Sequence, residues 1–272
     1  MPEELEIDAA LNNVTLIEAA NEREEAEALA SAMRAALEPT NEISEPTVAL
    51  VTPDRNLARR VVIELRRHGI EADDSGGRVL SATSQGTLAR LVTHVAFAPG
   101  DPVALATLIK HPLVRFGHAE PKARELSELV ELLGLRGGVG TADLEELPEL
   151  VMAGAGKRIE KHAPRWLASI TDDEVAAAHE YALAIRDAFA PLMALFPQTD
   201  AQSFGQDGSN GTISDLAFAT ATVLERIADN GTGDLQDLWS DEAGKALAKL
   251  LIECRESDTG LSISGFEWIG TL

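Results

Sequence analysis

The sequence is poor in cysteine, in aromatic residues and in basic side chains, and it has no long apolar run. Its single cysteine, Cys254, excludes a disulfide framework, a cysteine-based zinc site and an iron–sulfur cluster built within this chain. No run approaches the ~18 consecutive apolar residues of a membrane-spanning helix. Residues 1–30 are acidic, whereas a secretory signal peptide is basic and then apolar. We therefore expect a cytoplasmic chain without a membrane contact.

Basic residues number 23 against 45 acidic ones, so the formal net charge is −22. The imbalance is uneven, because residues 1–50 hold 2 basic and 12 acidic side chains, whereas residues 51–98 hold 7 arginines and 5 acids. Free nucleic-acid-binding domains usually present a basic face, because neutralising phosphates drives their affinity. Only the stretch from Arg55 to Arg67 can supply such a face here. We interpret the acidic surface elsewhere as a solubility device.

The first part of the chain has the pattern of an α/β protein. Short segments that can form strands lie at Val14–Ile17, Val48–Val51 and Ile70–Asp73, and helical patterns lie at 21–37, 53–68 and 85–97. Strands and helices in this order predict a small parallel sheet flanked by helices, as in a partial RecA-like domain. Asn21 is predicted to cap the first helix and Thr52 the second.

The rest of the chain has helical rather than strand character. Helical spacing of Leu, Ala, Ile and Val covers 102–109, 120–133, 142–152, 157–169, 172–195, 214–228 and 235–255. Segment 198–211 is polar and rich in glycine, which predicts a loop. We therefore expect two domains, an α/β segment over 1–98 and a mostly α-helical domain over 99–272.

The chain offers few catalytic patterns. A phosphate-binding P-loop has Ser or Thr after its lysine, and the nearest approach, Gly154–Arg158, has arginine there. The 6 histidines show no metal-ligand spacing on a helix. Asp73 and Asp74 follow a predicted strand, where two carboxylates can hold magnesium or, as the Ser-Gly-Gly that follows favours, form a turn. We therefore predict no catalytic residue, no metal ion and no cofactor in this chain.

The second predicted helix concentrates arginine on one side. Arg55, Arg59 and Arg66 fall within about 40° of one another when successive residues turn by about 100°. Arg60 and Arg67 form a second stripe about 100° away. Such a face can grip phosphates or an acidic partner surface, because guanidinium groups match both. The alternative is a solvated face whose arginines pair with acidic neighbours on this helix and on the Glu-rich first helix.

Several short motifs in the first 117 residues resemble those of a known family. They are Leu50-Val51-Thr52-Pro53-Asp54-Arg55, Leu57-Ala58-Arg59-Arg60-Val61, Asp73-Asp74-Ser75-Gly76, Gly86-Thr87-Leu88 and Lys110-His111-Pro112-Leu113. These motifs look like those in the middle of the sequences of the AddB family. Its members are the B subunits of bacterial AddAB-type helicase–nucleases. Residues 14–81 also resemble the start of the second RecA-like motor domain in UvrD-type superfamily 1 helicases. The family-motif positions are Thr52, Asp54, Arg55, Asp74 and Gly76.

The resemblance implies a role in processing DNA double-strand breaks for recombination. It implies that the chain is a central fragment of a longer protein. Its partners would be an AddA-like helicase–nuclease subunit and, through the complete complex, DNA. Active motors of this type carry a phosphate-contacting arginine after the fourth-motif strand, where this sequence has Thr52. The resemblance therefore implies a non-catalytic segment that supports the partner subunit and guides the DNA strand.

Two other classes of protein fit the same residues. One is a small-molecule or nucleotide-binding α/β protein with a helical cap, whose site would be the turn at residues 73–77. The other is a plain interaction module whose acidic helices dock a basic partner.

Overall fold

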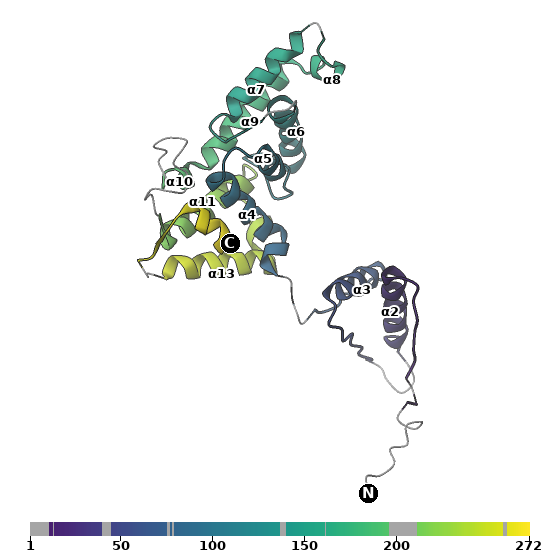
Figure 1. Cartoon of the computed structure of the whole chain (residues 1–272). Helices are drawn as coiled ribbons and strands as arrows, with labels where there is room; N and C mark the ends of the chain where they lie inside the picture. The colour runs from purple at the N-terminus through teal and green to yellow at the C-terminus, as the bar shows by residue number, and fades with distance from the viewer. Residues whose placement is uncertain are drawn as a thin grey trace. The chain divides into compact units, whose positions relative to one another are not determined.

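The structure, a computed structural model, describes residues 11–12, 14–39, 45–74, 77, 79–136, 140–160, 162–195, 211–257 and 260–272 (Figure 1). The chain divides into two compact units, Met1–Gly77 and Arg78–Leu272. Helix α4 (Ser84–Phe97) belongs to the second unit, because it packs against helices from the C-terminal part of the chain. The division therefore falls before α4, where we expected it after residue 98.

Unit 1 (Met1–Gly77) is built on two helices, α2 (Glu22–Ala36) and α3 (Arg55–Arg67), which pack against each other (Figure 1). The buried residues of this pair are Ala26, Ala30, Val61 and Leu65. The two alanines lie one turn apart on α2, and their small side chains leave room for the larger valine and leucine of α3. The core of unit 1 is therefore small.

The prediction of a small parallel sheet within residues 1–98 is wrong. The segments predicted as strands have no regular secondary structure, and no ladder joins them within the described residues. The sheet that the described chain does contain lies in unit 2 (Arg78–Leu272). It has two short antiparallel strands, β1 (Gly211–Thr212) and β2 (Ser262–Ile263), with Gly211 opposite Ile263. The protein is mostly helical rather than α/β.

The exposure of the Val48–Val51 run gives the physical reason. A parallel strand in an α/β fold is covered on both faces. Here Leu50 packs on the buried cluster of the helix pair, whereas Val51 is 94% exposed. Ile70 and Ala72 contact the same cluster, and the residues between and after them are exposed. The helix pair thus covers one side of these segments, and their inward apolar side chains are accommodated without a sheet.

Polar side chains mark the starts of both helices of unit 1. Asn21 caps α2 as predicted, since its side chain accepts a hydrogen bond from the backbone N–H of Glu24 at 3.0 Å. The prediction that Thr52 caps α3 is wrong. Asp54, not Thr52, accepts from the backbone N–H of Asn56, at 2.8 Å. Thr52 accepts from the backbone N–H of Asp54 at 3.1 Å, so it shapes the turn before the helix begins.

Unit 2 is helical around one contiguous apolar core. Its further α-helices are α5 (Pro102–Ile109), α6 (Glu120–Val130), α7 (Leu147–Gly156), α8 (Arg165–Ala168), α9 (Asp172–Ala188), α10 (Ala190–Met193), α11 (Ile213–Ala228), α12 (Gln236–Trp239), α13 (Glu242–Glu256) and α14 (Gly265–Thr271). Short turns are η1 (Leu80–Ala82), the π-helical η2 (Glu131–Leu135) and η3 (Lys157–Ile159). The helices predicted over 85–97, 102–109 and 214–228 are confirmed to within one residue. The single helix predicted over 157–169 is wrong, because Pro164 starts the separate helix α8.

The contact between α7 and η2 requires a residue without a side chain. A Cβ atom at Gly154 of α7 would lie 1.7 Å from the carbonyl oxygen of Leu133 in η2. Helix α7 packs against α9 as well, so this contact holds the end of α6 in the helical stack. The Gly154–Arg158 stretch is therefore the packed end of α7 followed by η3, not a phosphate loop.

Replacing Gly154 by alanine is expected to destabilise unit 2 by about 2 kcal/mol or more, because α7 and η2 must separate to admit the methyl group. Gly156→Ala is the matched control, since no atom lies within 4 Å of its Cβ position and alanine is the better helix former. Urea unfolding followed by circular dichroism measures both changes. Wild-type stability of Gly154→Ala would contradict the contact.

Candidate functional site

Helix α3 places the arginines predicted as contact residues on its solvent side. These residues are Arg55, Arg59, Arg60, Arg66 and Arg67, and all are exposed. The opposite side of α3 carries the buried Val61 and Leu65. The helix is therefore held by its apolar stripe while its cations point into solvent.

Three of the α3 arginines, Arg55, Arg60 and Arg67, have a carboxylate partner. Arg60 lies 2.7 Å from Glu22 of α2, and Arg67 lies 3.0 Å from Glu64 one turn earlier. These pairs match the solvated alternative, and exposed ion pairs contribute at most ~1 kcal/mol each. Arg59 and Arg66, seven positions apart on α3, have no ion-pair partner among the described residues. They are the part of the arginine face that a ligand can engage without breaking a pair.

The predicted motif positions are partly brought together. Arg55 donates to the Asp74 carboxylate at 3.3 Å, so the start of α3 meets the segment that follows it. Thr52 and Asp54 lie at the same end of α3, where both serve the turn and the cap. Gly76 lies outside the described residues. No group of three His, Cys, Asp or Glu suited to a metal ion occurs in the described part of the chain, including the surroundings of Asp74.

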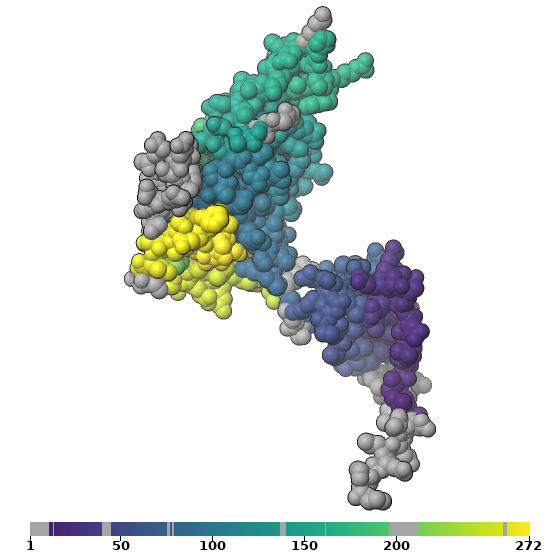
Figure 2. Space-filling view, in the orientation of Figure 1, coloured from purple at the N-terminus to yellow at the C-terminus, as the bar shows by residue number. Residues whose placement is uncertain are grey.

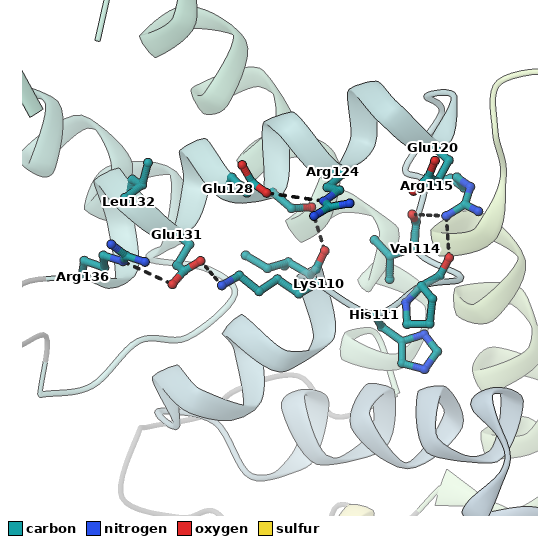
Figure 3. A pocket seen from close by; sticks show the side chains of 13 residues that line it. Lys110, His111, Val114, Arg115, Glu120, Arg124, Glu128, Glu131, Leu132 and Arg136 are labelled. Carbon is teal, nitrogen blue, oxygen red and sulfur yellow. Dashed lines mark hydrogen bonds and ion pairs between the residues drawn. The ribbon is translucent and has the colours of Figure 1, made fainter. Parts of the chain in front are cut away.

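Sequence reasoning missed a groove of about 540 Å³ in unit 2 (Figure 3). It is formed by the end of α5, the loop after it, α6 and η2. Its basic lining residues are Lys110, Arg115, Arg124 and Arg136. The Lys110–Leu113 motif was a signal for this place, but nothing in the sequence shows that α6 folds back beside it.

Glu131 is the central charged residue of this groove. Its carboxylate pairs with Lys110 on one side and with Arg136, at 3.3 Å, on the other (Figure 3). The Glu131 side chain is only 16% exposed, and this burial acts to raise its pKa. The hydrogen bonds and positive charges of Lys110 and Arg136 outweigh burial, so the pKa of Glu131 lies below its usual value. Glu131, at the start of η2, is thus ionised and joins the residue after α5 to the residue after η2.

The loop between α5 and α6 is fixed by Arg115. Its guanidinium donates to the carbonyl oxygens of Pro112 at 2.7 Å and Val114 at 2.9 Å (Figure 3). The backbone N–H of Arg115 donates to Ile227 at the end of α11. Burial lowers the pKa of His111 in this loop, against the opposing effect of a hydrogen bond with the Ser84 backbone. The Arg115 guanidinium therefore stabilises the loop, and its hydrogen bonds to the loop leave it little capacity to bind a ligand.

The wall of the groove includes Ser127, which forms a buried hydroxyl pair with Tyr181. Ser127 of α6 donates to the carbonyl oxygen of Ile109 at 2.7 Å, and its Oγ lies 3.3 Å from the hydroxyl of Tyr181. Burial raises the pKa of Tyr181 to about 12. A hydroxyl held so firmly in its neutral form does not act as a nucleophile or base near neutral pH. The groove is therefore a structural junction whose charges are mostly engaged.

Comparisons of the chain with models of known families, with curated proteins and with solved structures gave no match. Among the described residues, no helix combines the length and the apolar character needed to cross a bilayer.

The Glu131→Gln variant is expected to be less stable than the wild type by about 1 kcal/mol at pH 7, because it loses charge-assisted hydrogen bonds. Since the native pKa lies below the unfolded value near 4.5, the carboxylate stabilises the fold above that pH. The difference should shrink as the pH falls below 4.5 and vanish below the native pKa. Thermal unfolding from pH 7 to pH 3 measures this.

The matched control is Glu128→Gln, because Glu128 is 58% exposed and lies 3.5 Å from Arg124 in an ordinary surface pair. Its effect at pH 7 should stay below ~0.5 kcal/mol. A Glu131→Gln deficit that does not change with pH would show that packing, not charge, holds this junction.

Proposed function

We propose that this chain is a non-catalytic segment of a subunit of a DNA double-strand-break repair helicase–nuclease. In this role it supports the partner motor subunit and guides the unwound strand within the complex. The observation that carries the proposal is the exposed arginine face of α3, which follows directly on the Leu50–Arg55 motif. Arg59 and Arg66 on that face have no ion-pair partner among the described residues.

The support for this proposal is the resemblance of the short motifs, since the strand that the resemblance places before Thr52 does not form among the described residues. Thr52 occupies the position where motors of the resembled type carry an arginine, and its hydroxyl is engaged by the backbone N–H of Asp54. Threonine has no positive charge to hold a nucleotide phosphate. The chemistry at this position therefore supports a scaffold rather than an ATPase.

Charge favours a protein as the first partner of the α3 face. A net charge of −22 repels a free polyanion at long range, so DNA alone should bind α3 weakly. An acidic patch on a folded partner subunit meets the arginines over a short distance and with matching fork geometry. We therefore assign the α3 face to the partner subunit, with DNA reached in the assembled complex.

The purified chain is expected to release no phosphate from ATP and magnesium above background, with or without single-stranded DNA, because Thr52 supplies no charge for the phosphates. A phosphate-release assay with an active superfamily 1 helicase as positive control makes the measurement. Robust DNA-stimulated turnover would overturn the proposal.

Reversing both unpaired charges, in Arg59→Glu/Arg66→Glu, is expected to weaken binding to an AddA-like helicase–nuclease subunit at least about tenfold. The control Arg90→Glu/Arg124→Glu makes the same charge change on two exposed arginines of unit 2 and should keep the affinity. Biolayer interferometry with the immobilised partner subunit measures both.

Absence of any wild-type binding in that assay would contradict the proposal. A nucleotide or sugar phosphate that raises the melting temperature instead would favour the small-molecule class of function.

A further inference from the structure

The arginine face of α3 has an exposed isoleucine at its centre. Ile63 is 53% exposed, although isoleucine is among the residues most often buried. At about 100° per residue, Ile63 lies about 40° from Arg59 and about 60° from Arg66 around the helix axis. Arg60 and Arg67 lie about 60° and about 40° away on its other side. Ile63 therefore separates the two arginine stripes of α3, which lies at the surface of unit 1 (Figure 2).

Two arginines without an ion-pair partner among the described residues flank Ile63 along the helix as well. Arg59 lies four positions before Ile63 and Arg66 three positions after it, the spacings at which helical side chains are neighbours. Asn56, three positions before Arg59, extends this row with an exposed, uncharged side chain. We name Asn56, Arg59, Ile63 and Arg66 the Ile63 row. It contains two positive charges, one apolar side chain and no carboxylate.

A single exposed apolar side chain is ordinary on a protein surface, so the neighbours of Ile63 decide its meaning. Ile252 of α13 is 53% exposed as well. The lysine one turn before Ile252 pairs with Glu253 at 3.8 Å, and Arg255, one turn after it, lies over the Phe218 ring. The cations beside Ile252 are thus engaged within the chain, whereas those beside Ile63 have no ion-pair partner among the described residues.

We propose that the Ile63 row docks an acidic amphipathic helix of the partner subunit, with Ile63 against its apolar side and Arg59 and Arg66 on two of its carboxylates. These arginines are seven positions apart, or about 10 Å along α3, because a helix rises ~1.5 Å per residue. Two carboxylates seven positions apart on a helix that lies along α3 span the same distance. The turn between them offers a hole for Ile63, and flanking ion pairs fix partner choice between packed helices.

Nucleic acid fits the Ile63 row less well. Sequence-tolerant binding of a single strand relies on aromatic side chains on which bases stack, and α3 has none. A phosphate backbone can use the two arginines but gains nothing from an aliphatic side chain between them. An acidic helix with an apolar side neutralises the arginines and covers Ile63 at the same time.

The inference rests on the proposed function for the use of the α3 face, and it adds the form of the partner's surface. The test therefore measures binding of the full chain to two probes at low salt. One probe is the AddA-like subunit. The other is a fluorescein-labelled, alanine-based helical peptide of about 20 residues, long enough to form a helix in water. It carries a central leucine, with glutamates four positions before and three positions after it.

Ile63→Ala should weaken binding to both probes about tenfold, because it removes apolar surface that the partner helix covers. Ile63→Leu should retain most of the affinity, since leucine restores that surface. Ile252→Ala is the matched control, because Ile252 has the same exposure on another helix and should leave both affinities unchanged. Biolayer interferometry with the subunit and fluorescence anisotropy with the peptide make the measurements.

Exchanging the charges across the interface tests the role of the two arginines. Arg59→Glu/Arg66→Glu should lose the glutamate peptide and should bind a peptide with lysines in place of the two glutamates, because opposite charges then face each other again. The wild-type chain should not bind the lysine peptide through this face. Anisotropy of the two labelled peptides gives both comparisons.

Unchanged binding of either probe by Ile63→Ala, or an equal loss in Ile252→Ala, would overturn the inference. So would failure of the wild-type chain to bind the glutamate peptide, or tighter binding of oligo(dT) through the same arginines. If Arg59→Glu/Arg66→Glu loses the AddA-like subunit while Ile63→Ala keeps it, the inference fails and the proposed function stands. If the peptide binds through Ile63 but the AddA-like subunit does not bind, the proposed function fails and the acidic helix belongs to another partner.

Discussion

The excess of carboxylates over cations governs how the charged side chains of this chain are arranged. The chain has 23 basic residues against 45 acidic ones. More than half of the cations in the described residues form an ion pair with a carboxylate. Several of these pairs organise the fold, since Lys110 and Arg136 meet at Glu131 and Arg158 reaches Asp172.

The two units differ in the size of their apolar cores. Unit 1 buries four residues between its two helices, so little apolar area holds α3 in place. The arginines of α3 lie on its exposed side. Unit 2 has a long contiguous core, and its junctions are made by close backbone contact and buried polar bonds. The glycine of α7 against Leu133 and the Trp268 indole bonded to Thr220 at 3.0 Å are examples. Stability therefore resides in unit 2.

The sequence predicted those elements whose signals are local. Asn21 capped its helix and α5 spans its predicted residues, because a capping side chain and a helical apolar stripe act within a few positions. The Val48–Val51 run failed as a buried strand, because an apolar run does not reveal whether neighbouring strands or a helix pair will cover it. The groove beside Lys110 was missed for a related reason. Glu131 reaches it only through the π-helical turn, which no local pattern announced.

Several polar residues of the described chain hold the fold through hydrogen bonds. Asp54 and Thr52 shape the start of α3, Arg115 holds its own loop and Arg158 ties η3 to Asp172. Arg59 and Arg66 on α3 are among the cations without an ion-pair partner in the described residues. The α3 face that we propose for a partner subunit is therefore separate from the polar residues that hold the fold.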